Sequence, residues 1–205
     1  MEPDAGGDAG KALRDLVAAA QAGDHEAFGR LVECRRDLVF RVAFQHVGNA
    51  DDARLVTQAV FVRLWRHFDR YDPGRRFDTW LYQVTVNASI DHHRRGARRR
   101  REQPLEELFH VPAAEPLPAA ERRVEATEVQ RILTELASEL PERQRSAFLL
   151  REVEGLTTGE VAEALGTTES TVRNHVLQAR RHLQEALRAR YPEYAGTHRR
   201  GEDLS

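Results

Sequence analysis

The sequence has one cysteine and no long apolar run. Because Cys34 is the single cysteine, a framework of internal disulfides is excluded, and this low cysteine content is typical of proteins in a reducing compartment. Cys34 stands in an apolar helical pattern, so we expect its side chain to be buried. No apolar stretch approaches the ~20 residues of a membrane span, and the acidic, glycine-rich start lacks the basic and apolar regions of a signal peptide. We therefore expect a cytoplasmic protein without a membrane span.

The sequence also lacks the patterns of β-strands and of enzyme sites. No alternating apolar run is long enough to predict a strand. Nine histidines are present, but the neighbours His92 and His93 point to different helix faces. No cysteine or carboxylate set completes a metal or acid–base site, and a glycine-rich phosphate loop is absent. We predict no enzymatic activity, no metal and no cofactor.

Helical periodicity and segregated charge are what the chain does have. The formal net charge of −2 hides separate basic and acidic blocks. The apolar spacing predicts an all-α protein with two small helical domains, at residues 12–101 and 129–190. Between them, residues 102–128 hold four prolines and an excess of acids, which is typical of a linker. Residues 1–11 and 191–205 are predicted to be a flexible start and a fraying tail.

Breaks in the periodicity divide the first domain into four helices. The first covers residues 12–23, and Asp24 is expected to cap the second. The stretch GNADD at 48–52 then restarts the chain. The turn YDPGRRF precedes a fourth helix, from about Asp78 to Arg95, capped by Asp78 or Thr79. The third helix carries an apolar stripe of Ala53, Val56, Val60 and Leu64, widened by Phe61, Trp65 and Phe68.

The segment RRFDTWLYQVTVNASIDHHRRGARRRR at 75–101 combines aromatics, amides and arginines. Trp80, Leu81, Val84 and Ala88 are expected to face inward, whereas Gln83, Asn87, Asp91 and Arg94 form one polar stripe that leads into the arginine run. Aromatic and amide groups beside cations suit single-stranded DNA whose bases have left the stack. The alternative is that Phe77 and Trp80 are ordinary core residues and the arginines are a solvated run.

The segment TTGEVAEALGTTESTVRNHVLQARRHL has the plan of a helix-turn-helix. A helix from Thr158 to Leu165 is followed by the turn Gly166–Thr167 and by a second helix that starts at Thr168 or Ser170. Val161, Ala162 and Leu165 are expected to pack against Val172, Val176 and Leu183. That packing leaves Arg173, Asn174, Gln178, Arg180 and Arg181 pointing outward. Side chains of these types can bind the base edges and phosphates of DNA, so we predict DNA binding. A plain helical hairpin with a solvated charged face is the alternative.

Residues 24–188 resemble an extracytoplasmic-function sigma factor. The resemblance lies in AFGRLVE, in NADDARLVTQAVFVRLWRHFDRYDPGRRFDTWLYQVTVNASIDHHRR and in LPERQRSAFLLREVEGLTTGEVAEALGTTESTVRNHVLQARRHL. It implies a dissociable promoter-specificity subunit of bacterial RNA polymerase. The implied partners are the polymerase core, through the clamp of its largest subunit and the flap of the second, and promoter DNA. An anti-sigma factor is left open as a further partner.

The resemblance also implies site residues. The positions that match the capture of the melted minus-ten strand are Arg75, Arg76, Phe77, Thr79, Trp80, Asn87, Asp91, Arg94 and Arg95. The positions that match recognition of the duplex minus-thirty-five element are Thr171, Arg173, Asn174, His175, Leu177, Gln178 and Arg181. The positions expected to contact the polymerase core are Asp52, Gln58, Phe61, Leu64 and Trp65.

The third helix departs from the family pattern. Where the family usually has DAEDLVQE, this chain has DARLVTQA at 52–59, so that Arg54, Leu55 and Ala59 replace three acids. Two alternatives therefore stay open. One is a degenerate sigma-like protein that does not dock on the polymerase, such as a decoy for an anti-sigma factor. The other is a stand-alone helix-turn-helix regulator, which would leave the block at 24–101 unexplained.

Overall fold

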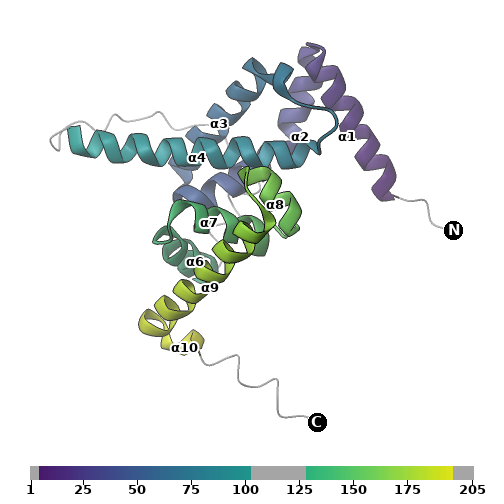
Figure 1. Cartoon of the computed structure of the whole chain (residues 1–205). Coiled ribbons are helices and arrows are strands. Elements are labelled where there is room, and N and C mark those ends of the chain that lie inside the picture. The colour runs from purple at the N-terminus through teal and green to yellow at the C-terminus, as the bar shows by residue number, and fades with distance from the viewer. Residues whose placement is uncertain (1–4, 103–127, 196–205) are drawn as a thin grey trace, which may run out of the picture. The chain divides into compact units, whose positions relative to one another are not determined.

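The computed structural model describes residues 5–102 and 128–195 (Figure 1). Every regular element in these two ranges is a helix, so the predicted all-α class is confirmed. The chain divides into two compact units, an N-terminal one within residues 1–126 and a C-terminal one within residues 127–205. None of the described helices is long and apolar enough to cross a membrane. The predicted linker lies almost wholly outside the described residues.

In the N-terminal unit, local capping signals set the helix ends. The elements are α1 (Ala5–Gln21), α2 (His25–Val47), α3 (Ala50–Arg66), the 3₁₀ turn η1 (Phe68–Arg70) and α4 (Phe77–Glu102). Asp24 caps α2 as predicted, because its Oδ1 accepts hydrogen bonds from the backbone N–H groups of Glu26 and Ala27 at 2.9 and 3.0 Å. Gly48, at φ 81°, ends α2, and Asn49 caps α3, which confirms the predicted break.

Two of the predicted helix starts were late. Helix α1 begins at Ala5 rather than at residue 12, and it includes Gly6, Gly7 and Gly10, which are weak helix formers and gave no helical signal in the sequence. Helix α4 begins at Phe77, so neither Asp78 nor Thr79 is its cap. The carboxylate of Asp78 instead accepts a hydrogen bond from Nε of Arg35, on α2, at 2.8 Å.

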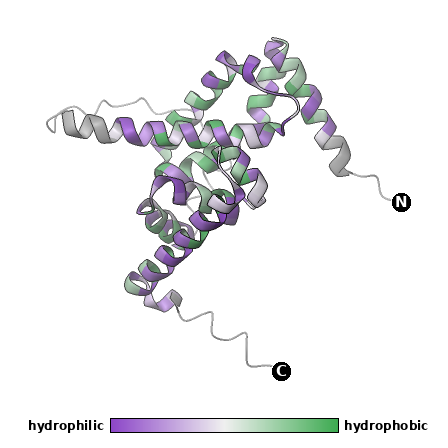
Figure 2. Cartoon of the chain, viewed as in Figure 1, coloured by the Kyte–Doolittle hydropathy of each residue, from purple (hydrophilic) through white to green (hydrophobic). Residues whose placement is uncertain are grey.

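The core of this unit joins all four long helices. Along these helices, hydrophobic and hydrophilic residues alternate in the ribbon of Figure 2. The predicted stripe of α3 is confirmed for Ala53, Val56, Val60 and Leu64, which are buried together with Phe61 and Phe68. Trp65, which was predicted to widen the stripe, is instead 39% exposed. Cys34, in contrast, is exposed and not buried as predicted. Residues on either side of it, from Glu33 to Asp37, are mostly exposed. The side of α2 that faces the core is formed by other residues, among them Leu31, Val39 and Phe40.

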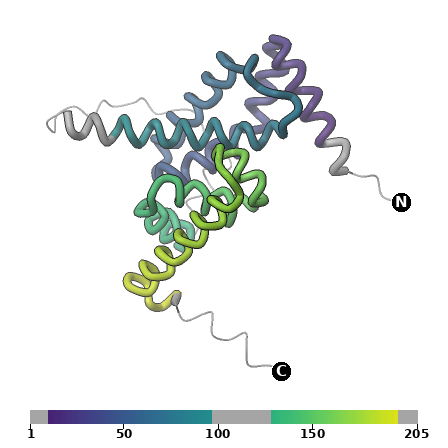
Figure 3. The backbone as a smooth tube through the Cα atoms, viewed as in Figure 1, coloured from purple at the N-terminus to yellow at the C-terminus, as the bar shows by residue number. Residues whose placement is uncertain are grey.

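The C-terminal unit contains the predicted helix-turn-helix. Its elements are α6 (Glu128–Ser138), α7 (Glu142–Phe148), the π-helical turn η2 (Leu149–Val153), α8 (Thr158–Leu165), α9 (Glu169–Arg190) and α10 (Pro192–Ala195). Gly166 ends α8 at φ 59°, and the side chain of Thr168 accepts from the backbone N–H of Thr171 at the start of α9. Helix α9 continues unbroken well beyond the motif (Figure 3).

Helix α9 serves two parts of the core. Near its start, where α9 packs against α8, Val172 and Val176 are buried, as are Val161 and Ala162 of α8. Leu183, which we predicted to contact the first helix of the motif, instead packs with Ala179 in a cluster with α6. The residues of α6 in this cluster are Ile132, Leu136 and Ala137, and Leu140, just beyond the end of α6, joins them.

The predicted fraying from Tyr191 is wrong for residues 191–194. The hydroxyl of Tyr191 donates to Glu135 at 2.9 Å, and that of Tyr194 donates to Glu128 at 3.0 Å. Arg190 contacts both carboxylate oxygens of Glu139. These contacts join the end of α9 and α10 to α6 and to Glu139 directly after it, over separations of 51 to 66 residues that no local pattern indicates.

Arg145 ties α7 to the end of α6. Its side chain is buried, and Nη2 donates to the carbonyl oxygens of Ser138 and of Leu140. Burial lowers the pKa of this guanidinium, although the neighbouring Glu142 favours its charged form.

We expect Arg145→Met to lower the free energy of unfolding of the C-terminal unit by about 1–3 kcal/mol, because two carbonyls lose their donor. Urea unfolding followed by far-UV circular dichroism measures the loss, and Arg143→Met, at an exposed site on α7, is the matched control. Equal stability of the two variants would contradict this role.

Candidate nucleic-acid interface

The turn between η1 and α4 rests on a cluster of aromatic rings. Trp80 stacks on Phe68 with ring centroids 5.9 Å apart and an interplanar angle of 3°, and its centroid lies 5.1 Å from that of Tyr71. Phe77 packs edge-on against Tyr71 at 5.5 Å. Phe77 is only 5% exposed, and Trp80 is half-buried. The buried ring of Phe77 is therefore not available to contact a DNA strand. It supports the turn by packing against Tyr71.

Hydrogen bonds hold the shape of this turn. The Asp72 carboxylate accepts from the backbone N–H of Gly74 at 2.9 Å, and the Tyr71 hydroxyl donates to the carbonyl of Arg75 at 2.7 Å. Burial, with the nearby Asp72 and Asp78 carboxylates, raises the pKa of Tyr71, so its hydroxyl stays protonated as a donor. Arg75 and Arg76 are exposed on the turn.

One residue that supports the turn was not predicted from the sequence. The side-chain amide of Gln21, the last residue of α1, donates to the carbonyl oxygens of Phe68 at 3.2 Å and of Tyr71 at 2.8 Å. These partners lie 47 and 50 residues away along the chain. A glutamine at the end of an amphipathic helix carries no local signal for such a contact, so only the fold reveals it.

Helix α4 places the other predicted strand-contacting residues. Asn87, Arg94 and Arg95 are exposed. Asp91 is partly exposed and accepts a hydrogen bond from Arg63 of α3 at 3.2 Å. Thr79 is 4% exposed and lies in the interior, so it offers no contact surface. The side chains of Arg98 to Arg101 lie outside the described residues.

The predicted polymerase-contacting residues of α3 fall into two groups. Phe61 and Leu64 are core residues and offer no contact surface, because the apolar stripe of α3 turns them inward. Gln58 and Trp65 are exposed, and Asp52 is partly exposed. Burial alone would raise the pKa of Asp52, but hydrogen bonds from Asn49 at 2.8 Å and His92 at 2.9 Å outweigh it and lower that pKa.

The second helix of the helix-turn-helix presents most of its predicted reading residues. Arg173, Asn174, Leu177, Gln178 and Arg181 are exposed, whereas Thr171 and His175 are partly buried. The hydroxyl of Thr171 is hydrogen-bonded to that of Thr168 at 2.9 Å. The start of α9 therefore carries amide and guanidinium donors on the side that such a helix turns toward the major groove.

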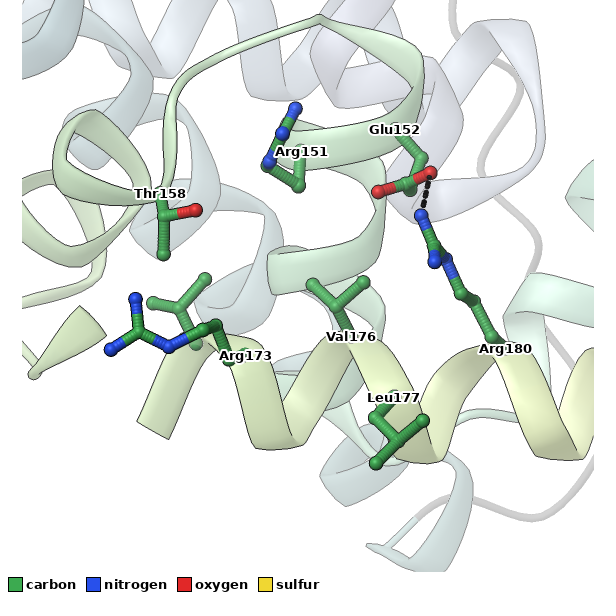
Figure 4. A pocket seen from close by; sticks show the side chains of 8 residues that line it. Arg151, Glu152, Thr158, Arg173, Val176, Leu177 and Arg180 are labelled. Carbon is green, nitrogen blue, oxygen red and sulfur yellow. Dashed lines mark hydrogen bonds and ion pairs between the residues drawn. The ribbon is translucent and has the colours of Figure 1, made fainter. Parts of the chain in front are cut away.

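A groove of about 330 Å³ runs beside these residues (Figure 4). Arg151, Glu152 and Thr158 line one side, and α9 lines the other with Val172, Arg173, Val176, Leu177 and Arg180. Two of the arginines are held by carboxylates, because Arg180 donates to Glu152 at 2.7 Å and Arg173 donates to Glu169 at 3.1 Å. Arg151, Glu152 and Thr158 were not predicted as site residues, since they come near α9 only through the packing of η2 and α8.

Within the described residues no group of three or more His, Cys, Asp or Glu could hold a metal ion.

Comparisons with known proteins follow the same division into two units. The model of Sigma-70 region 2 matches residues 31–100, and that of Sigma-70 region 4 matches residues 130–183. Together these stretches cover α4 as far as residue 100, with its preceding turn, and the helix-turn-helix through Leu183.

Relatives and a solved structure match most of the chain. The ECF RNA polymerase sigma factor SigD of Mycobacterium tuberculosis is 35% identical over 186 residues, which cover 87% of this chain and 85% of SigD. SigE of Mycolicibacterium smegmatis is 34% identical over 161 residues, which cover 78% of this chain but only 62% of SigE. CnrH, solved in complex with the cytosolic domain of CnrY, is 25% identical with a TM-score of 0.64, over 86% of this chain and 97% of CnrH. The chain belongs to the extracytoplasmic-function sigma factor family, whose members direct RNA polymerase to promoters.

Proposed function

We propose that the two units of this chain divide promoter recognition between them. The C-terminal unit reads the duplex minus-thirty-five element with the start of α9. The N-terminal unit docks on the polymerase core and captures the unpaired minus-ten strand with the turn at Arg75 and Arg76 and with the exposed face of α4. The observation that carries the proposal is that one chain presents exposed Arg and Asn side chains on a helix-turn-helix and again, in a separate unit, beside an arginine-bearing turn.

The energies involved are of matching size. Stacking of a flipped base is worth about 1–3 kcal/mol, and a stacked step of duplex DNA costs about 1.4 kcal/mol to open. Capture of a few bases can therefore hold open a bubble that thermal motion starts. The chain itself needs no catalytic group for this role, because the polymerase carries out the synthesis.

Run-off transcription tests this proposal. Purified core polymerase from the source organism is supplied with this chain and a pool of genomic promoter fragments. We expect specific transcripts that depend on the presence of the chain. At the promoters that the unchanged chain uses, we expect these transcripts to disappear when the Arg173→Ala variant replaces it. A chain that binds duplex promoter tightly and specifically without the polymerase, and yields no transcript with it, would instead be a stand-alone helix-turn-helix regulator.

We also propose a protein regulator of the anti-sigma type as a partner. CnrH was solved together with the cytosolic domain of a second protein, CnrY. Both units here carry exposed apolar side chains, among them Trp65 in the first and Val153 and Leu177 in the second. Aromatic side chains such as Trp65 are enriched at protein interfaces. Co-purification of the tagged chain from its source cells, with and without added core polymerase, tests for a competing partner.

Gln21 is expected to position the strand-capturing turn. Gln21→Leu removes both hydrogen bonds to the turn while keeping the side chain's size, at about 1 kcal/mol for each bond. We expect up to about thirtyfold weaker binding of a single-stranded minus-ten oligonucleotide by the holoenzyme. Tyr71→Phe, which removes the bond to Arg75, should act in the same direction. Affinity for duplex minus-thirty-five DNA should not change, and an equal loss for both DNA types would show a general folding defect instead.

A further inference from the structure

The acids on helix α4 are paired with arginines of other helices. Among the side chains of α4 that the structure describes, the acids are Asp78 and Asp91. Asp78, near the start of the helix, is held by Arg35 of α2 at 2.8 Å. Oδ2 of Asp91 accepts a hydrogen bond from Nη2 of Arg63, on α3, at 3.2 Å. Each of these carboxylates is therefore balanced by a cation from a neighbouring helix.

Asp91 lies in the middle of the surface that is proposed to capture the minus-ten strand. Asn87 stands four residues before it, and Arg94 and Arg95 stand three and four residues after it. Residues at these spacings lie next to one another on one side of a helix. The side chain of Asp91 is 43% exposed and that of Arg63 is 37% exposed. A strand that follows α4 from Asn87 to the arginines would thus pass close to the Asp91 carboxylate.

The part of α4 around Asp91 has further contacts with α2 and α3. Nε2 of His92 lies 2.9 Å from Oδ1 of Asp52, in the first turn of α3. Nε2 of His93 donates to the carbonyl oxygen of His46, near the end of α2, at 2.7 Å. These two contacts remain when Arg63 is replaced, and the ion pair itself is partly exposed to water. We therefore expect Arg63 to add little to the stability of the fold.

We propose that Arg63 is a positioning residue for strand capture, and that it acts by neutralising Asp91. The inference rests on the proposed function and deepens it, because it assigns a residue of α3 to the surface that α4 presents to DNA. The guanidinium of Arg63 cancels the charge of the carboxylate, so that the phosphates of the strand meet Arg94 and Arg95 without a free anion beside them. An unpaired carboxylate at this place would repel the phosphates, most strongly at low salt.

Arg63→Met tests the inference, because it removes the cation and leaves the Asp91 carboxylate beside the strand. Binding of a fluorescent single-stranded minus-ten oligonucleotide to preformed holoenzyme is measured by anisotropy at low and high salt. We expect Arg63→Met to bind about three- to tenfold more weakly at low salt. The difference from the unchanged chain should shrink at high salt, because salt screens the repulsion.

Two further variants separate charge from shape. Adding Asp91→Asn to Arg63→Met removes the carboxylate but keeps the size of the side chain, and it should restore the affinity to within about twofold of the unchanged chain. Arg63→Lys keeps the positive charge and should lose less affinity than Arg63→Met. A purely structural role of the ion pair predicts the opposite, because the double variant and the lysine both lack its hydrogen-bond geometry.

Arg54→Met is the matched control. Arg54 also lies on α3 and is also paired with an acid, since it contacts Asp51 at 2.6 Å. It stands nine residues before Arg63, which is about two and a half helical turns and places it on the opposite side of α3. We expect Arg54→Met holoenzyme to bind the oligonucleotide normally. Urea unfolding of each variant confirms that the N-terminal unit is folded.

Four outcomes would overturn the inference. The first is unchanged binding by Arg63→Met. The second is a double variant that binds as weakly as Arg63→Met, which would show that Arg63 contacts a phosphate itself. The third is a loss that is equal at low and high salt, and the fourth is an equal loss in Arg54→Met. In each case, chain-dependent transcription would leave the proposed function standing. If the unchanged holoenzyme neither binds the oligonucleotide nor yields transcripts, the proposed function itself fails.

Discussion

Trp80→Ala is expected to lower the free energy of unfolding of the N-terminal unit by about 3 kcal/mol, near the lower end for loss of a large aromatic side chain. The ring stacks on Phe68 and contacts Tyr71 and Phe77, so its removal leaves a cavity beneath the turn. The ring is only half-buried, which places the effect below that of a fully enclosed tryptophan. Urea unfolding followed by the fluorescence of the remaining Trp65 measures the change.

Asn87→Ala separates strand capture from this stability effect. Asn87 is exposed on α4, so its replacement should leave the unfolding transition unchanged within about 0.5 kcal/mol. We expect the holoenzyme to form a normal closed complex with duplex promoter but to open the strands poorly, as read by permanganate reactivity of thymines. Unchanged reactivity in Asn87→Ala would remove this residue from the capture site. A stable Trp80→Ala variant would show that the aromatic cluster is not what supports the turn.

The second large effect is expected from the arginines around the captured strand. Replacing Arg75, Arg76, Arg94 and Arg95 with glutamine removes four exposed cations. Each phosphate contact to single-stranded DNA contributes about 0.7 to the slope of log affinity against log salt concentration. We therefore expect the slope to fall by about 3 if all four contact phosphates. Titration of the holoenzyme with a fluorescent minus-ten oligonucleotide at several salt concentrations measures the slope.

A matched set of surface arginines controls for overall charge. Arg14, Arg30, Arg36 and Arg70 are also exposed in the N-terminal unit, and their replacement with glutamine changes the net charge equally. We expect a much smaller change in slope for this set, because long-range attraction is screened by salt. If the first set altered the preference among oligonucleotide sequences while leaving the slope unchanged, those arginines would contact bases rather than phosphates.

Local sequence signals determined the helices and the helix-turn-helix. Asp24, Asn49 and Thr168 cap their helices through side-chain oxygens that reach backbone N–H groups two or three residues ahead. Gly166 ends α8 because a residue without a Cβ adopts positive φ at little cost. These interactions are complete within one turn of chain, so the sequence alone predicts them. The start of α1 was missed because Gly6, Gly7 and Gly10 are weak helix formers, whereas the start of α4 was missed by only one residue.

The site residues were harder to predict, because their exposure is a property of the fold. The residue types at Phe77, Thr79, Phe61 and Leu64 fit a binding surface as well as a core, and the packing of the helices buries all four. The same packing leaves Cys34, Leu55 and Val62 exposed.

Sequence by itself determined the helical elements, the two-part plan and the residue types suited to DNA, because each depends on neighbours within a few positions. Tertiary structure alone decided which of those side chains reach the surface and which distant residues support them, such as Gln21 beneath the turn at Arg75. The physical reason is that burial and long-range hydrogen bonds depend on how helices pack against one another. A periodic pattern shows which side of a helix is apolar, but it does not show which other helix packs against that side.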